Sequence, residues 1–336
     1  MTDYKNLIDG KMVDNGQWLE VLNPATEQVV GRVPSCGKEE LDSAVAAARR
    51  AFTQWKKTTA EERQQVVQGI AAAIKENADE LYRLLTSEQG KPHAQAQQEI
   101  YGAAGLAAAQ STLTLDDVIN QDDDTRLSRT RRVPVGVVGG IVPWNFPIMM
   151  AIQKIVPALV AGCTIVLKPS PFTPLTTLRV AELIKDVVPA GTVNIITGED
   201  TLGPLITEHP DIDKITFTGS TATGKKIMEG ASGDLKRITL ELGGNDASIV
   251  LPDADVEKVA EQLFWSSFSN AGQVCIAAKR IYIHEDIYDD LSKAIADYAK
   301  TVVVGDGSQQ GTGVGPIQNK KQYERVLDLI QDAKDN

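Results

Sequence analysis

Apolar positions recur at helical spacing through most of the first third of the chain. One stripe, on a helix of about five turns, is formed by Leu41, Val45, Ala48, Phe52 and Trp55. Alanine-rich segments over 61–88 and 94–111 continue the helical character, with a break at Gly90-Lys91-Pro92. Residues 114–132 then become polar, first acidic and then basic, which is typical of an exposed ribbon. We therefore expect a mostly helical first third that leads into a ribbon.

Beyond Val133, short β-branched runs alternate with helical segments of about 10 to 15 residues. The runs cover residues 136–142, 164–167, 193–196, 214–217 and 247–251. This alternation predicts an α/β fold in which a parallel, doubly wound sheet carries helices on both faces. Ligands of such sheets bind at the carboxyl ends of the strands, so the loops that follow the strands are the first place to look for function.

The last part of the chain continues the mixed pattern. A helix-start signal at Pro252–Asp255 precedes a predicted strand over 280–284 and helices over 286–302 and 317–334. The most apolar region, 148–167, is interrupted by Gln153-Lys154 and by Pro157. It therefore predicts a buried helix that leads into a strand, and not a membrane span.

Composition narrows the class of protein. The 336 residues are enough for two domains, and 45 acidic against 34 basic residues give a formal net charge of −11. A surface with this much negative charge repels the phosphate backbone of nucleic acids. The four arginines within 126–132 fit a solvated or interface-facing strand better than a nucleic-acid site. Three cysteines far apart and no signal peptide at the N-terminus suit a reducing compartment. We expect a cytoplasmic protein that binds neither nucleic acid nor membrane.

The loop Thr218–Lys226 follows a predicted strand and opens a helix. Free backbone N–H groups at a helix start attract anions, so this context suits phosphate. Lys226 stands where a nucleotide P-loop needs Ser or Thr, and the glycine spacing of the standard dinucleotide fingerprint is absent. By itself the loop is equally typical of a phosphate cradle and of an ordinary glycine turn.

Two further loops carry candidate chemistry. Glu241 ends a strand-like run and is followed by Leu242 and twin glycines; it is either a solvated strand end or a residue beside a ligand. The run Pro143–Pro147 combines two prolines with two aromatic residues around Asn145. Prolines stiffen such a loop, and an amide that stabilises an oxyanion must be held in place in advance. The alternative is a packed turn.

Cys275 closes the run Asn270–Cys275, directly after a glycine break. None of the three histidines, His93, His209 and His284, lies in these loops, so a Cys–His pair is unsupported and a carboxylate is the better base. No Cys or His spacing suggests a metal such as zinc.

Together, the motifs Pro-Trp-Asn-Phe-Pro, Phe-Thr-Gly-Ser-Thr, Glu-Leu-Gly-Gly and Gly-Gln-Val-Cys resemble the aldehyde dehydrogenase superfamily over essentially the whole chain. The resemblance implies that the thiolate of Cys275 attacks an aldehyde, while the Asn145 amide and the Cys275 backbone N–H hold the oxyanion. It further implies that Glu241 activates the hydrolytic water and that Lys154 sits behind Glu241 and helps to relay its proton.

For the cofactor, the resemblance implies NAD or NADP bound along the strand-end loops. Gly219, Ser220 and Gly224 match the pyrophosphate turn, and Lys168 and Ser170 belong to the Lys-Pro-Ser stretch that meets the adenosine ribose. The cofactor groove would be lined by Ile141, Val142, Pro143, Trp144 and Leu242. Many NAD-using relatives carry a glutamate where this chain has Pro171, so a 2′-phosphate would not be repelled there.

The resemblance also implies a domain organisation: a Rossmann-like cofactor-binding domain over 1–113 and 133–241, an oligomerisation ribbon over 114–132, and an incomplete α/β catalytic domain over 242–336. Family members are longer, and the Glu-x-Phe-Gly-Pro motif does not occur here. We therefore expect a C-terminally truncated chain whose homo-oligomer is impaired and whose catalytic domain exposes apolar surface. The alternatives to aldehyde oxidation are a cofactor-independent thiol esterase and a cofactor-binding pseudoenzyme.

Overall fold

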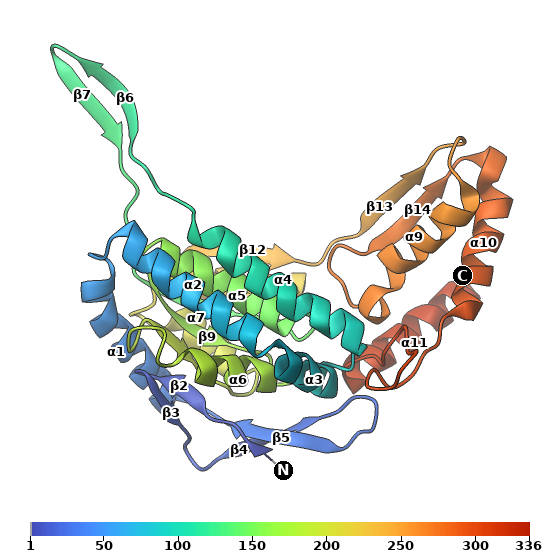
Figure 1. The fold of residues 1–336 in the computed structure, drawn as a ribbon, viewed down its shortest axis with the longest axis horizontal. Helices are drawn as coiled ribbons and strands as arrows, with labels where there is room; N and C mark the ends of the chain where they lie inside the picture. The colour runs from blue at the N-terminus through green and yellow to red at the C-terminus, as the bar shows by residue number, and fades with distance from the viewer. Residues whose placement is uncertain (1) are drawn as a thin grey trace.

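The computed structural model describes residues 2–336 and has a mixed sheet at its centre (Figure 1). Its seven strands run in the order β12-β11-β8-β9-β10-β2-β3. The first five are parallel to one another, and β2 and β3 add an antiparallel edge. The strand bounds are Arg237–Leu242 for β12, Lys214–Gly219 for β11, Val137–Ile141 for β8, Thr164–Lys168 for β9, Val193–Ile195 for β10, Asn6–Ile8 for β2 and Lys11–Val13 for β3.

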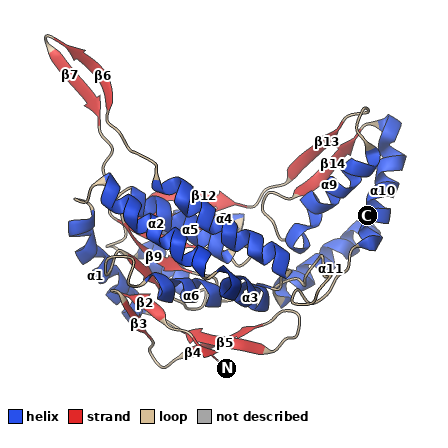
Figure 2. Cartoon of the chain, viewed as in Figure 1, coloured by secondary structure: helices blue, strands red, loops and turns tan. Residues whose placement is uncertain are grey.

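Helices cover both faces of this sheet, as the alternating pattern predicts (Figure 2). Successive residues of a strand point to opposite faces. In β9, Ile165 and Leu167 pack in one core, while Val166 packs in the other. The first core also takes in helices α2 (Ala60–Glu76), α3 (Ala78–Gln89), α4 (His93–Ser111), α5 (Pro147–Val160) and α6 (Leu175–Ile184). The second takes in α1 (Lys38–Trp55), α7 (Leu202–Glu208) and α8 (Thr221–Ala231).

The single helical segment expected over 61–88 is two helices. A capping box between Thr59 and Glu62 begins α2, and Asn77, at φ −106° and ψ 18°, separates α2 from α3. The break expected at Gly90 is present, because Gly90 ends α3 in the left-handed conformation. Propensity alone did not indicate the first of these two breaks.

The first 34 residues contain strands that the sequence did not predict. Besides β2 and β3, a three-stranded sheet of order β1-β5-β4 is formed by Thr2–Asp3, Val29–Pro34 and Trp18–Leu22. Most of these strands are only two to five residues long. So short a strand shows too few alternations for the pattern to be recognised.

Residues 114–132 contain an exposed antiparallel hairpin that projects from the sheet domain (Figure 1). Its strands are β6 (Val118–Asp123) and β7 (Arg126–Thr130). The Asp123 carboxylate shapes the turn by accepting hydrogen bonds from the backbone N–H groups of Thr125 and Arg126.

At the other end of the molecule, a two-stranded parallel sheet packs against helices (Figure 1). It consists of β13 (Asp246–Val250) and β14 (Ala278–Ile283), and its core includes residues of α9 (Val256–Phe268) and α10 (Tyr288–Thr301). The exposed helix α11 (Lys320–Asp335) ends the chain. Asp255 caps α9, as its helix-start signal predicts, and α11 begins three residues later than expected, after the cap Asn319. Ile249 and Tyr282 leave 75% and 53% of their surface exposed, so this sheet does present apolar side chains to solvent. Within residues 2–336, no helix is long and apolar enough to span a bilayer.

Candidate active site

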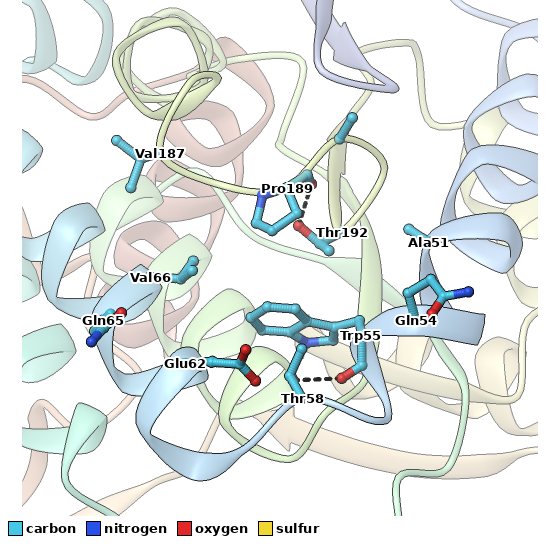
Figure 3. A pocket seen from close by; sticks show the side chains of 11 residues that line it. Ala51, Gln54, Trp55, Thr58, Glu62, Gln65, Val66, Val187, Pro189 and Thr192 are labelled. Carbon is cyan, nitrogen blue, oxygen red and sulfur yellow. Dashed lines mark hydrogen bonds between the residues drawn. The ribbon is translucent and has the colours of Figure 1, made fainter.

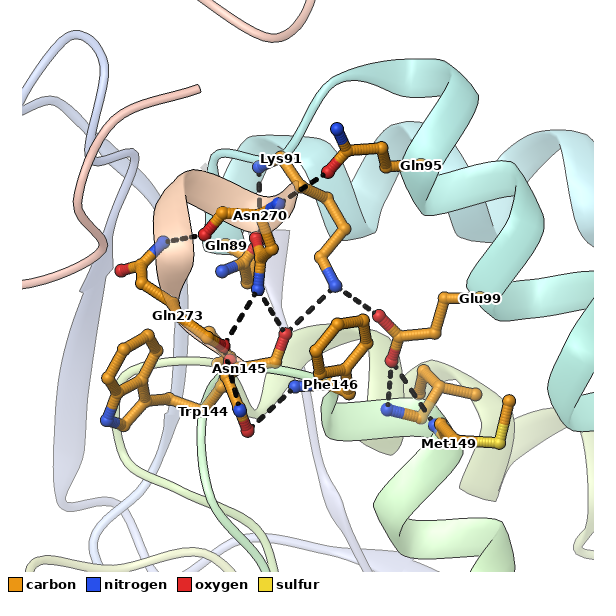
Figure 4. A network of polar contacts seen from close by, with 12 residues as sticks. Gln89, Lys91, Gln95, Glu99, Trp144, Asn145, Phe146, Met149, Asn270 and Gln273 are labelled. Atoms are coloured by element: carbon orange, nitrogen blue, oxygen red, sulfur yellow. Dashed lines mark hydrogen bonds and ion pairs between the residues drawn. The ribbon is translucent and has the colours of Figure 1, made fainter. Parts of the chain in front are cut away.

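Asn145 lies in the loop between β8 and α5, and four hydrogen bonds fix it (Figure 4). Its side-chain Nδ2 donates to the carbonyl oxygen of Gln273 at 3.0 Å, and its Oδ1 accepts from the Phe146 backbone N–H at 3.1 Å. Its backbone carbonyl accepts from Lys91 Nζ at 2.9 Å and from Asn270 Nδ2 at 3.1 Å. An amide nitrogen carries two hydrogens, so one N–H of Asn145 is left for a substrate oxygen.

The segment before Cys275 has a strained backbone. Asn270, Ala271 and Gly272 follow one another at φ values of 51°, 57° and 74°. Residues other than glycine rarely adopt this left-handed region, and such strain persists only where surrounding contacts impose it. Those contacts are a hydrogen bond from the Asn270 N–H to Gln95 Oε1 and one from Gln273 Nε2 to the Asn270 carbonyl.

Cys275 is the exposed cysteine of the three, whereas Cys36 and Cys163 are buried. Burial raises the pKa of the Cys36 thiol to about 12, so that thiol stays protonated and unreactive. The backbone carbonyl of Cys275 accepts a hydrogen bond from Lys279 Nζ at 2.7 Å, which ties the end of the turn to β14.

Glu241 is the penultimate residue of β12 and lies beside Thr218 of β11. Lys154 of α5 donates to the hydroxyls of Thr218 and Thr216 at 2.8 and 3.2 Å. Burial lowers the pKa of Lys154 to about 8, and attraction to Glu241 offsets part of that shift. Within residues 2–336 the Glu241 side chain makes no hydrogen bond or ion pair, with Cys275 or with any other residue, and it is exposed.

The residues predicted to bind a cofactor gather along the carboxyl edge of the sheet. In the strand register, Ile141 lies opposite both Lys168 and Phe217. The N–H of Val142 bonds to the Lys168 carbonyl at 3.1 Å, and the Trp144 carbonyl accepts from Thr173 at 3.3 Å. Pro143 lies between them, and Ser170, buried, accepts a hydrogen bond from the Phe172 N–H.

Lys168 is a buried lysine with a weak set of partners. Its Nζ reaches only the carbonyl of the adjacent Pro169, at 3.4 Å, among the described residues. Burial lowers its pKa to about 8, and Asp200 offsets part of the shift. An ammonium with unused hydrogens at a strand end suits a ribose hydroxyl or a phosphate, so the residues present fit a dinucleotide.

Packing explains the two glycines in the turn between β11 and α8, apart from any role in binding. A Cβ at Gly219 would overlap the Phe217 ring, and one at Gly224 would lie 2.8 Å from a methyl group of Leu242. Ser220 caps α8 by accepting from the Thr223 N–H at 3.2 Å. Packing therefore favours glycine at both positions, and the N–H groups of Thr221 and Ala222 in the first turn of α8 remain available to an anion.

Two hollows on the protein lie away from these residues. A cavity of about 570 Å³ is lined by the end of α1, the start of α2 and residues 187–192 (Figure 3). Thr192 directly precedes β10, which places this cavity near the amino ends of the parallel strands. Since none of the predicted site residues lines it, it is separate from the candidate active site.

Sequence reasoning missed several residues of the network around Asn145. The sequence predicts only a helix break at Lys91, and it predicts no role for Glu99, Gln95, Asn270 or Gln273. The local sequence carries no signal for Lys91, which stands in the polar break between two helices, or for Glu99, which follows two glutamines. Charged residues are almost never fully buried unless they are paired, and the pairing of these two appears only in the fold.

The protein therefore combines a largely parallel sheet, polar loops at the carboxyl ends of its strands, and an exposed cysteine two residues after the carbonyl that holds the Asn145 amide. The model of the aldehyde dehydrogenase family matches residues 12–336. The chain belongs to the aldehyde dehydrogenase family.

Similar proteins and solved structures support the same family. The chain is 45% identical over 325 residues to a probable aldehyde dehydrogenase from a Pseudomonas species, covering 96% of this chain and 66% of that protein. It is 40% identical to the NADP+ succinate-semialdehyde dehydrogenase of Escherichia coli, covering 97% of this chain and 69% of the relative. The NAD+ complex structure of aldehyde dehydrogenase from Bacillus cereus superposes with a TM-score of 0.96 at 39% identity, covering 99% of this chain and 70% of the other. The chain thus spans about two thirds of the length of these relatives.

Proposed function

We propose that this protein oxidises an aldehyde to a carboxylic acid with NAD or NADP, using Cys275 as a covalent nucleophile. The observation that carries the proposal is the Asn145 amide, fixed on the carbonyl of Gln273 two residues before an exposed thiol. Family membership favours this activity over a cofactor-independent esterase or a pseudoenzyme.

The first step forms a bond between the Cys275 sulfur and the aldehyde carbon, and the carbonyl oxygen becomes an oxyanion. The free N–H of Asn145 and the backbone N–H of Cys275 stabilise that oxyanion. Because the Asn145 loop is already held by hydrogen bonds, its amide needs no reorganisation during the reaction. A nicotinamide held in the groove would supply the hydride acceptor for this adduct, and loss of the hydride from the former aldehyde carbon would leave an acyl thioester on Cys275.

The second step is hydrolysis of the thioester, for which Glu241 takes a proton from water. Its exposed position at a strand end is suited to exchanging protons with solvent. Lys154, whose pKa is lowered to about 8, attracts the Glu241 charge from behind and is suited to passing a proton along.

For the cofactor, Lys168 and Ser170 would meet the adenosine ribose, and Gly219, Ser220 and Gly224 would hold the pyrophosphate at the start of α8. The groove beside them is formed by Ile141, Val142, Pro143, Trp144 and Leu242. Lys168 has unused hydrogens and Pro171 adds no carboxylate, which supports acceptance of a 2′-phosphate as well as a ribose hydroxyl. The E. coli relative is named for NADP+ and the B. cereus structure contains NAD+, so both cofactors occur among similar proteins.

We also propose that residues 1–113 and 133–241 form the cofactor-binding domain, 242–336 the catalytic domain, and 114–132 an arm that pairs copies of this chain. Support for the arm comes from its projecting, exposed hairpin, which carries Ile119 and Leu127 on its surface. A cytoplasmic location and the absence of nucleic-acid or membrane partners remain predictions from composition.

The test is to follow the absorbance of reduced cofactor with a panel of aliphatic, aromatic and carboxylated aldehydes, using NAD and NADP separately. We expect reduction with at least one aldehyde, and none above background in Cys275→Ala. Equal rates in the wild type and Cys275→Ala would refute the role of the thiol. If ester hydrolysis persists and depends on Cys275 while no aldehyde is oxidised, the esterase alternative is correct.

A further inference from the structure

We propose that Lys91 is a positioning residue for the Asn145 loop: its buried ammonium, paired with Glu99, fixes the Asn145 carbonyl and thereby aims the Asn145 amide. This inference rests on the proposed function and extends it to two residues that touch neither substrate nor cofactor.

Lys91 is held in place by close backbone packing. It lies in the turn between α3 and α4, directly after the left-handed Gly90. A Cβ at Gly307 would lie 2.6 Å from the carbonyl oxygens of both Gly90 and Lys91, and the His93 N–H bonds to the Gly307 carbonyl at 3.1 Å. The turn therefore has little freedom, and the lysine side chain enters the interior from a fixed point.

The ammonium of Lys91 has a specific set of partners and is fully buried (Figure 4). Its Nζ donates to Glu99 Oε2 at 2.5 Å and to the Asn145 carbonyl at 2.9 Å. It also lies 3.9 Å from the centre of the Phe146 ring. The two residues it touches besides Glu99 are thus consecutive members of one loop.

Glu99 also contacts the chain just after this loop. Its second carboxylate oxygen accepts hydrogen bonds from the N–H groups of Ile148 and Met149 at 3.0 and 3.2 Å. These groups belong to the first turn of α5, where helix N–H groups have no partner within the helix. One ion pair therefore anchors the chain both at Asn145 and three residues later.

Stability is a poor explanation for this pair. Removing two charges from water costs several kcal/mol per ion in general, and replacing a buried pair by apolar residues is often neutral or stabilising. What the pair supplies is a defined geometry at Asn145, to which Asn270 adds a second hydrogen bond on the same carbonyl. Since Asn145 in turn contacts Gln273, the pair influences the position of the segment that carries Cys275.

The test removes both charges together in Lys91→Met/Glu99→Gln, so that neither ion is left alone in the interior. We expect kcat for aldehyde oxidation to fall on the order of 10- to 100-fold with little change in KM. Arg179→Met/Glu80→Gln, which removes a partly exposed ion pair between α6 and α3, controls for the loss of two opposite charges and should leave kcat unchanged.

Two measurements separate positioning from a general structural role. In an Asn145→Ala background, Lys91→Met/Glu99→Gln should lower the residual kcat less than threefold, because it acts through the amide that is already missing. Hydrogen–deuterium exchange should become faster in peptides covering 145–150 and 270–275 and stay unchanged in α1. Full additivity with Asn145→Ala, or unchanged exchange in both peptides, would overturn the proposal.

The exchange measurement does not depend on turnover. If the wild type oxidises no aldehyde, the proposed function fails, and the exchange data still decide whether Lys91 positions the loop. If the double variant does not fold, Lys91→Arg, which keeps the ion pair but changes the geometry of the donor, gives the same comparison with a smaller expected loss.

Discussion

Two lysines, Lys154 and Lys168, are buried near the carboxyl edge of the sheet. Burial removes water from their ammonium groups and so disfavours the charged form. Burial lowers the pKa of each to about 8, although Glu241 and Asp200 act in the opposite direction. Groups with shifted pKa values concentrate at functional sites because reactions need protons to move near neutral pH. These two residues are therefore the electrostatic signature of the proposed site.

The shift at Lys154 makes protein stability depend on pH. Below about pH 8, Lys154 is charged in both the folded and the unfolded protein, and burial of its ammonium lowers the stability of the folded state. Between about pH 8 and its ordinary pKa of 10.5, Lys154 is neutral in the folded protein but still charged in the unfolded chain, so stability rises with pH. The free energy of unfolding of the wild type should therefore rise relative to Lys154→Met, by about 1–2 kcal/mol between pH 7.5 and 9.5. Urea unfolding at the two pH values measures this.

The exposed Lys225 of α8 provides the control, because Lys225→Met removes a lysine that solvent already surrounds. Its difference from the wild type should be the same at both pH values. A Lys154→Met difference that stays constant or moves in the opposite direction would show that Lys154 is not the desolvated group described.

Among the elements, the loop over 303–318 packs closely against the turn at Gly90 and Lys91. A Cβ at Gly315 would overlap the Gly90 carbonyl oxygen, and Gln318 Nε2 donates to the carbonyls of Glu88 and Phe172 at 3.2 Å each. Backbone atoms cannot move aside as a flexible side chain can. This loop thus braces the turn from which Lys91 projects.

We expect Gly315→Ala to lower the free energy of unfolding by about 3 kcal/mol, because the added methyl group meets backbone on a second element. Gly305→Ala, in the same loop, meets only the Thr312 hydroxyl at 3.6 Å and should change stability by less than about 1 kcal/mol. Urea unfolding of both variants tests this. Equal effects of the two substitutions would contradict the described packing.

The sequence predicted the elements and residues whose chemistry is local. Cys275, Asn145 and Glu241 were predicted as site residues because each residue type stands in an unusual loop or at the end of a strand. Lys91 and Glu99 were not, because their partners lie 54 and 49 residues away, at Asn145 and at Ile148, and only the fold brings them together. The left-handed φ values at Asn270 and Ala271 were equally out of reach, since only surrounding contacts impose them.

Across the whole molecule, two features lie at opposite ends: the projecting hairpin and the two-stranded sheet β13–β14 (Figure 1). Both present apolar side chains to solvent, among them Leu127 and Ile249 at 62% and 75% exposure. Contiguous exposed apolar surface is characteristic of protein–protein contact. The exposed side chains on the hairpin support its proposed role as an oligomerisation arm.

That role predicts that the hairpin determines the mass in solution. The wild type should sediment as an oligomer, and Ile119→Asp/Leu127→Asp should shift it toward the single chain without changing its unfolding in urea, because these side chains are exposed within one chain. Analytical ultracentrifugation gives the mass. A wild-type monomer, or an oligomer that the two substitutions leave intact, would contradict the role.

The central claim, that Cys275 forms a covalent bond with the substrate, is tested most directly by trapping the thioester. The protein is mixed with an aldehyde and NAD or NADP, quenched in acid and digested, and the cysteine peptides are weighed by mass spectrometry. We predict an acyl group on the peptide containing Cys275, which needs both aldehyde and cofactor and accumulates further in Glu241→Gln. Aldehyde turnover with that peptide unmodified, or with the acyl group on Cys36 or Cys163, would contradict the account.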